Sequence, residues 1–132
     1  SDEVGQWWLA DHTYSGNAAN LSIASQAGGC FCERWANKEV QHLQVVFADP
    51  PRLLRMVGGL GPLQEEAIAA VMDWKLSPVE GENATQFTLI YKASGFRPAG
   101  MSGWADPVDQ VLGQQVASLA DYLAAQQTPA AR

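Results

Sequence analysis

The strongest periodic pattern of hydrophobic positions lies near the end of the chain, over residues 107–126. Apolar side chains recur there at steps of three and four residues and form one continuous stripe. The stripe consists of Val108, Val111, Leu112, Val116, Leu119, Tyr122 and Leu123. Asp106 followed by Pro107 is typical of a helix start, with Asp106 as the N-cap. The pattern predicts one long amphipathic helix with a solvated polar face that includes Gln114, Gln115 and Ser118, and a frayed tail over residues 127–132.

Residues 21–95 carry the pattern of β-strands instead. Six segments combine strand-forming residues with flanking turn residues, and they cover residues 21–24, 30–35, 40–48, 52–57, 67–78 and 85–94. The short connections between them favour antiparallel neighbours. In the last two segments hydrophobic and polar residues alternate, so one face of the sheet is expected to be covered and the other to face water.

These elements predict an α+β fold, in which a curved antiparallel sheet of about six strands wraps around the long C-terminal helix. On the covered face the small residues Ala70 and Ala93 are neighbours of the large residues Trp74 and Tyr91. Small side chains beside large ones leave room between sheet and helix, and such a space is the natural place for a ligand.

Composition narrows the classes of function. The chain has 132 residues, of which 47% are hydrophobic, and this length suits a single domain over residues 1–132. The formal net charge of −6 argues against nucleic acid and against an anionic membrane surface as partners. No apolar stretch is long enough to span a bilayer.

Five tryptophans are many for a chain of this size, and they are Trp7, Trp8, Trp35, Trp74 and Trp104. Each brings a large apolar surface and an N–H group that needs a partner, so the set indicates either a thick core or an aromatic-lined pocket.

Cys30 and Cys32 are the only cysteines. In a strand they point to the same side, which is a poor arrangement for a mutual disulfide, and we expect two small buried side chains. No group of Cys and His residues has the spacing of a zinc site, so the sequence predicts neither a metal site nor a cofactor.

Several motifs together resemble the SRPBCC superfamily, the START-related, birch-pollen-allergen-like proteins with the helix-grip fold. They are Trp7-Trp8, His12-Thr13-Tyr14-Ser15-Gly16, Gly28-Gly29-Cys30-Phe31-Cys32-Glu33, Asp49-Pro50 with Leu53-Leu54, the run from Gly58 to Gln64, and the closing helix. The nearest branch is that of bacterial polyketide-cyclase-like or heat-shock-ATPase-activator-like proteins. The resemblance implies a helix-grip fold with a ligand cavity, and a periplasmic or secreted location, with the cytoplasm as the alternative.

The sequence departs from the family pattern at its start. Family members have a strand before the Trp-Trp pair, whereas only residues 1–6 precede it here. We therefore expect six strands rather than seven, with an exposed sheet edge that would allow pairing with another chain in a dimer.

The resemblance and the aromatic residues predict the binding of a small hydrophobic or aromatic ligand, such as a lipid or a polyketide-like molecule, between sheet and helix. The expected ligand-binding residues are Trp8, Phe31, Glu33, Trp35, Met72, Trp74, Phe87, Leu89, Tyr91, Met101, Trp104, Val108 and Leu112. One alternative is a cyclase- or hydrolase-type enzyme that uses Glu33 with His12 or Tyr14 as acid and base. Another alternative is a protein-interaction module of the chaperone-activator kind, which would show an exposed apolar patch and no cavity.

Two orientations of Glu33 stay open at this point. Either Glu33 faces the cavity together with Phe31 and Trp35, or Cys30, Cys32 and Arg34 face inward and Glu33 is solvated. Of the two histidines, His12 is placed to pair with Asp11. Strict alternation along the third strand puts His42 on the same side as Gln44 and Val46, and for both histidines a structural or exposed role is favoured over a catalytic one.

Overall fold

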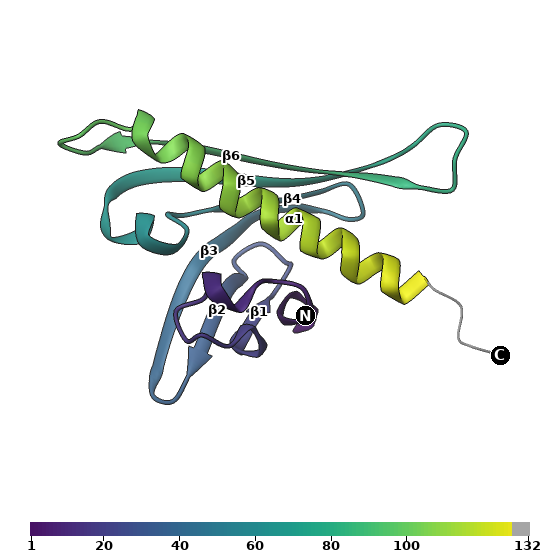
Figure 1. Cartoon of the computed structure of the whole chain (residues 1–132), viewed down its shortest axis with the longest axis horizontal. Coiled ribbons are helices and arrows are strands. Elements are labelled where there is room, and N and C mark those ends of the chain that lie inside the picture. The colour runs from purple at the N-terminus through teal and green to yellow at the C-terminus, as the bar shows by residue number, and fades with distance from the viewer. Residues whose placement is uncertain (128–132) are drawn as a thin grey trace.

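The computed structural model describes residues 1–127 and contains one six-stranded antiparallel sheet and one long helix (Figure 1). The strands are β1 (Leu21–Ile23), β2 (Cys30–Trp35), β3 (Lys38–Asp49), β4 (Leu53–Val57), β5 (Ala67–Pro78) and β6 (Thr85–Phe96), and the helix is α1 (Ala105–Gln127). The strands lie in the sheet in their sequence order. The predicted α+β class, six antiparallel strands and C-terminal helix are confirmed, whereas the frayed tail beyond Gln127 lies outside the described residues.

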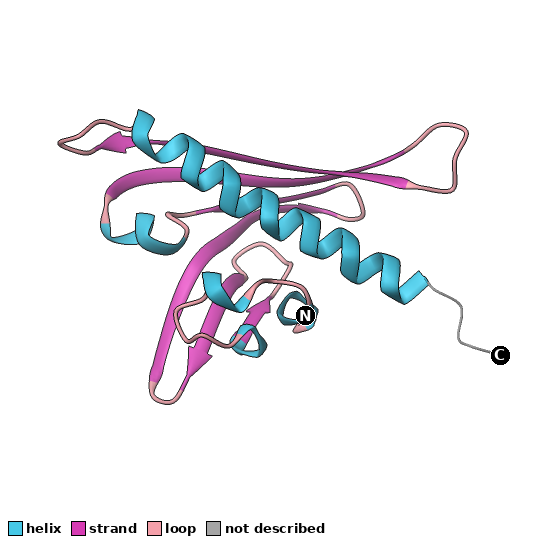
Figure 2. Ribbon diagram, viewed as in Figure 1, coloured by secondary structure: helices cyan, strands magenta, loops and turns pink. Residues whose placement is uncertain are grey.

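The sheet meanders because each strand is joined to the next by a short connection. Its longest part is the hairpin of β5 and β6, in which Ala67 pairs with Phe96 and Pro78 with Thr85. Figure 2 shows this hairpin as the long pair of strands that runs alongside α1. Alternation along β5 puts Ala70, Met72 and Trp74 on one face of the sheet, and this is the face that α1 crosses.

The opposite face of the sheet carries a charge pair. Arg55 and Asp73 are direct cross-strand neighbours on β4 and β5, and the guanidinium donates two hydrogen bonds to the carboxylate, at 2.8 and 3.1 Å. These hydrogen bonds lower the pKa of Asp73 and outweigh the opposing effect of its burial. The alternation therefore produces the predicted difference between a polar face and a covered face.

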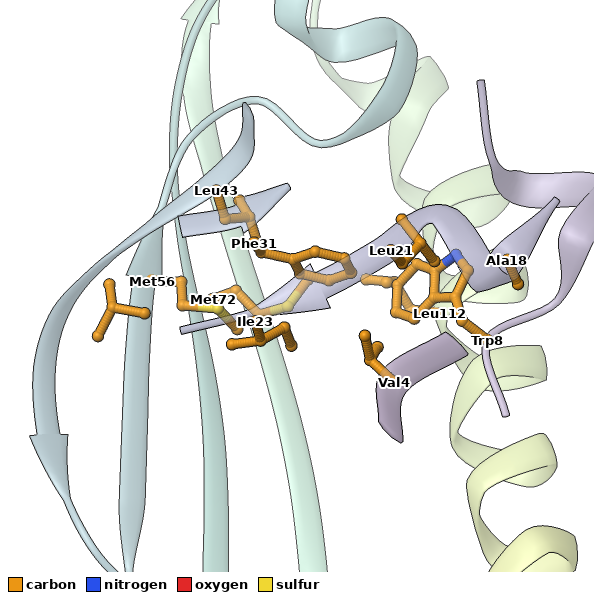
Figure 3. Close-up of a cluster of buried hydrophobic side chains, with 11 residues drawn as sticks. Val4, Trp8, Ala18, Leu21, Ile23, Phe31, Leu43, Met56, Met72 and Leu112 are labelled. Carbon is orange, nitrogen blue, oxygen red and sulfur yellow. The ribbon is translucent and has the colours of Figure 1, made fainter. Parts of the chain in front are cut away.

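Residues 1–20 contain three short 3-10 turns and no strand: η1 (Glu3–Gln6), η2 (Ala10–His12) and η3 (Ala18–Asn20). This N-terminal segment delivers Val4 and Trp8 to the core, where the Trp8 ring meets the Phe31 ring edge-on at 5.3 Å between centroids. Figure 3 shows Phe31 in the middle of the buried cluster, with Met56 and Met72 on one side of it and Trp8 and Leu112 on the other. The core thus joins three parts of the chain.

The N-terminal segment also covers part of the helix face that was expected to be solvated. Gln115 is fully buried, and its side-chain oxygen accepts a hydrogen bond from the backbone N–H of Leu9 at 2.8 Å. The Ser118 hydroxyl donates to the backbone oxygen of Trp7. The prediction of a solvated face is wrong for these two residues, because a segment more than 100 positions away in the sequence packs on them.

The start of the helix also differs from the prediction. The helix begins at Ala105, so Asp106 lies in its first turn and is not the N-cap.

Strand β3 has two register shifts against its neighbours. Cys32 pairs with Gln41 and Phe31 with Leu43, so His42 is an extra residue without a cross-strand partner. Such a bulge interrupts the regular alternation, so His42 and the residues after it do not follow one alternating pattern. His42 is buried, whereas Gln44 and Val46 are exposed. The prediction that His42 lies on the side of Gln44 and Val46 is therefore wrong.

The structure joins Cys30 and Cys32 in a disulfide, contrary to the expectation from regular strand geometry. Their Cα atoms lie 5.4 Å apart, whereas two residues at this spacing in a regular strand span about 6.6 Å. The register of β2 shifts between Phe31 and Cys32, so the strand is irregular at this point.

Within residues 1–127, no helix is both long and apolar enough to cross a membrane.

Candidate functional site

A mostly apolar cavity of about 280 Å³ lies between the sheet, α1, the N-terminal segment and the turn η4 (Gly61–Glu65). Its apolar lining comes from Trp8, Leu21, Phe31, Leu60, Pro62, Leu63, Tyr91, Trp104, Pro107, Val108, Val111 and Leu112. Its more polar lining comes from Asp11, His12, Thr13, Tyr14, Gly61 and His42. We call this space the inner cavity.

A second hollow of about 760 Å³ runs along β6 and the N-terminal half of α1. It is lined by residues of β6 such as Phe87 and Leu89, by Met101, and by helix residues as far as Val116. Five lining residues are common to both spaces, namely Leu63, Tyr91, Trp104, Val108 and Leu112. The outer groove, as we call it, therefore adjoins the inner cavity across these side chains.

Two tyrosines fix the loop that borders the inner cavity. The Tyr91 hydroxyl donates to the backbone oxygen of Gly58 at 3.1 Å and accepts from the N–H of Leu60 at 3.0 Å. Burial raises the pKa of Tyr91, so the hydroxyl keeps the proton that it donates. The Tyr14 hydroxyl donates to the backbone oxygen of Gly61 at 2.8 Å. The cavity wall is thereby tied to both β6 and the N-terminal segment.

Glu33 faces inward and is fully buried. Its carboxylate accepts three hydrogen bonds: from the backbone N–H of Tyr14 at 3.0 Å, from that of Ser15 at 2.6 Å, and from Nε2 of His42 at 2.9 Å. Burial alone would raise the pKa of Glu33, but the hydrogen bonds from Ser15, Tyr14 and His42 together outweigh it and hold the pKa below its ordinary value. Glu33 is therefore an ionised carboxylate in the interior.

His42 connects this carboxylate to the inner cavity, because its ring is part of the cavity lining. The rings of Tyr14 and Phe31 meet it edge-on, at centroid distances of 5.3 and 5.7 Å. An Nε2–H group must donate to the ionised Glu33, so the neutral ring has an acceptor lone pair at Nδ1. Nδ1 is buried and has no hydrogen-bond partner within residues 1–127.

Trp104, another residue that lines the cavity, has a second unpartnered polar atom. Its Nε1 is buried and finds no acceptor in the described part of the chain, and its ring borders both the inner cavity and the outer groove. The guanidinium of Arg97 lies 4.7 Å from the centre of this ring, which holds the ring in place through a cation–π contact.

The structure brings most of the predicted ligand-binding residues to these two spaces. Trp8, Phe31, Tyr91, Trp104, Val108 and Leu112 line the inner cavity, and Phe87, Leu89 and Met101 line the outer groove. Four predicted residues line neither space: Glu33, Trp35, Met72 and Trp74. Met72 is fully buried in the core, Trp74 lies against the rings of Trp7 and Phe87, and Trp35 is the last residue of β2.

The two residues named as acid–base partners of Glu33 lie at the cavity, but neither offers it a side-chain hydrogen bond. His12 pairs with the side-chain oxygen of Gln114 at 3.0 Å, not with Asp11. Tyr14 meets Glu33 through its backbone N–H, while its hydroxyl is bound to Gly61.

Sequence reasoning missed His42 as the side-chain partner of Glu33, although one signal was present. A two-residue turn at Ala36-Asn37 puts Val40 opposite Glu33, and the residue two positions further along lies diagonally across on the same face. That residue is His42.

The described residues contain no cluster of three or more His, Cys, Asp or Glu side chains that could hold a metal ion. No family model, curated protein or solved structure matches this chain. The resemblance to the SRPBCC superfamily therefore stays a prediction that rests on the sequence motifs, and the functional argument rests on the geometry of the cavity.

Proposed function

We propose that this protein binds a small hydrophobic or aromatic molecule in the inner cavity, in a helix-grip-like arrangement of sheet and helix. The observation that carries the proposal is the mostly apolar space of about 280 Å³ beside a helix of which only Leu112 and Gln115 are buried. An apolar cavity of about 150 Å³ holds a benzene ring. The inner cavity therefore has room for a molecule of about two fused rings or a short acyl chain.

The polar atoms at the cavity support the same proposal. Pockets for small molecules are lined mainly by apolar and aromatic side chains, with a few polar groups that orient the ligand. His42 Nδ1 and Trp104 Nε1 fit this description, because both are buried without a partner in the described part of the chain. Leaving such atoms unpaired costs free energy that a ligand would recover.

The alternative functions have weaker support. For the enzyme hypothesis, Glu33 does lie inside, but neither His12 nor the Tyr14 hydroxyl is hydrogen-bonded to it. The interaction-module hypothesis predicts an exposed apolar patch and no cavity. The structure contains a cavity.

A fluorescence titration tests the proposal, because Trp8 and Trp104 line the cavity and report on its contents. We expect a saturable change in tryptophan emission with members of a panel of naphthalene derivatives and medium-chain fatty acids and alcohols. Filling the cavity by Val111→Phe should weaken this binding at least about tenfold, since the added side-chain volume competes with the ligand for the same space.

The matched control is Val71→Phe, the same substitution at an exposed position of β5 that lines neither space. It should bind as the wild type does. The proposal is contradicted if no member of the panel binds saturably, or if Val111→Phe binds as tightly as Val71→Phe.

A further inference from the structure

We propose that Glu33 and His42 form a polar anchor that makes the inner cavity selective for aromatic molecules with a hydroxyl group. The inference rests on the proposed function and names the chemical class of its ligand. It starts from the contrast between a mostly apolar cavity and one fully buried, hydrogen-bonded charge beside it.

Glu33 fixes the chemistry that His42 offers. The carboxylate accepts from Nε2 of His42 at 2.9 Å and from the N–H groups of Tyr14 and Ser15. With three donors bound, its position is set by backbone atoms as well as by the imidazole. The imidazole therefore carries a proton on Nε2, and in its neutral form Nδ1 is the acceptor.

An acceptor nitrogen selects for a ligand that donates. A hydroxyl in the inner cavity would supply the partner that Nδ1 lacks within the described chain. A ligand of the same shape with a methyl group in that place would leave Nδ1 unpaired, and sites of this kind reject such analogues. A carboxylate ligand would bring a second negative charge close to ionised Glu33 and would be disfavoured.

The rest of the lining favours a ring over an acyl chain as the body of the ligand. Trp8, Phe31 and Trp104 present aromatic surfaces to the cavity, and aromatic rings pack well edge-to-face or offset against one another. The N–H of Trp104 is a donor, so it would bind a second oxygen where the ligand has one.

Calorimetric titration of the full chain with three probes of similar size tests the anchor. The probes are 2-naphthol, 2-methylnaphthalene and 2-naphthoate. We expect the wild type to bind 2-naphthol about tenfold more tightly than 2-methylnaphthalene, and 2-naphthoate more weakly than either.

The variant His42→Phe keeps a ring at this position but removes Nδ1. It should bind 2-naphthol and 2-methylnaphthalene with affinities within about twofold of each other. The matched control is Gln44→Phe, which introduces the same ring on the same strand at an exposed position that lines neither space. It should keep the wild-type preference.

A second measurement needs no variant and protects the test against a misfolded His42→Phe. The chain has two histidines, so ¹⁵N NMR of the wild type resolves their ring nitrogens. We expect 2-naphthol to shift the Nδ1 signal of His42 far more than 2-methylnaphthalene does, and far more than either ligand shifts the signals of His12.

The outcomes separate the two proposals. Equal binding of 2-naphthol and 2-methylnaphthalene, a preference that survives in His42→Phe, or tightest binding of 2-naphthoate would overturn the anchor and leave the cavity as a binding site. No binding of any of the three would contradict the proposed function, and the anchor with it.

Discussion

The residues around Phe31 and those along β6 face the same helix but are buried to different degrees. Phe31, Leu43 and Met56 are almost completely inaccessible to water. In contrast, no residue of β6 is fully buried, and Phe87, Leu89 and Tyr91 are only half-buried. The difference shows that one side of the sheet–helix layer is a packed core and the other is a hollow surface. The side chains around Phe31 stabilise the fold, and Phe31 also borders the inner cavity, whereas the side chains along β6 line the outer groove.

The way in which α1 is attached explains how the hollow side persists. The buried Gln115 of α1 accepts from the Leu9 N–H, and the Ser118 hydroxyl donates to the Trp7 carbonyl. The helix is thus held to the N-terminal segment by directional hydrogen bonds as well as by apolar packing. These bonds fix the helix from one side, and the outer groove lies between its N-terminal half and β6.

The largest expected effect comes from replacing one phenylalanine by alanine in each of the two regions. Phe31→Ala should reduce the free energy of unfolding by about 3–5 kcal/mol, because it removes a fully buried aromatic ring. Phe87→Ala should cost about 1 kcal/mol, because its side chain is half-buried and borders the outer groove. Urea denaturation of both variants measures the difference. Equal losses would mean that the two sides are packed alike.

A smaller expected effect concerns the pH dependence of stability. It compares the buried carboxylate of Glu33 with that of Asp73 on the opposite face of the sheet. Folding lowers the pKa of Glu33 below its ordinary value of 4.5, so ionised Glu33 stabilises the fold. This contribution is fully present above pH 4.5 and is lost as the pH falls through the lower pKa of the folded state. Glu33→Gln should therefore show a flatter decline in stability below pH 4.5 than the wild type does.

The control for this measurement is Asp73→Asn. The pKa of Asp73 is lowered too, mainly by the hydrogen bonds from Arg55 on the opposite face of the sheet. Asp73→Asn should independently reduce the loss of stability at low pH. The double variant should therefore lose less stability at low pH than either single variant does. Denaturation at a series of pH values records all four proteins, and a Glu33→Gln profile as steep as that of the wild type would contradict the account.

The sequence predicted the strands and the helix because their signals are local. Alternation along β5 and β6, turn residues between strands and the apolar stripe of α1 each depend on a few neighbouring residues. The same local signals left the orientation of Glu33 open. Its inward position depends on donors from Tyr14, Ser15 and His42, which come from two other parts of the chain.

Two of the predictions that proved wrong depended on a distant contact or on broken alternation. Gln115 looked solvated because its partner Leu9 lies 106 positions away. His42 was placed on the wrong side because strict alternation ignores the bulge beside Cys32. The imidazole that this prediction misplaced is also the group that the ligand hypothesis uses.

A crystal structure of the protein grown with 2-naphthol tests the central claim most directly. The account predicts electron density for the two rings inside the inner cavity, between Trp8, Trp104 and Leu112, with the hydroxyl within hydrogen-bond distance of His42 Nδ1. A cavity filled by the protein's own side chains, or a ligand bound only elsewhere on the molecule, would contradict it.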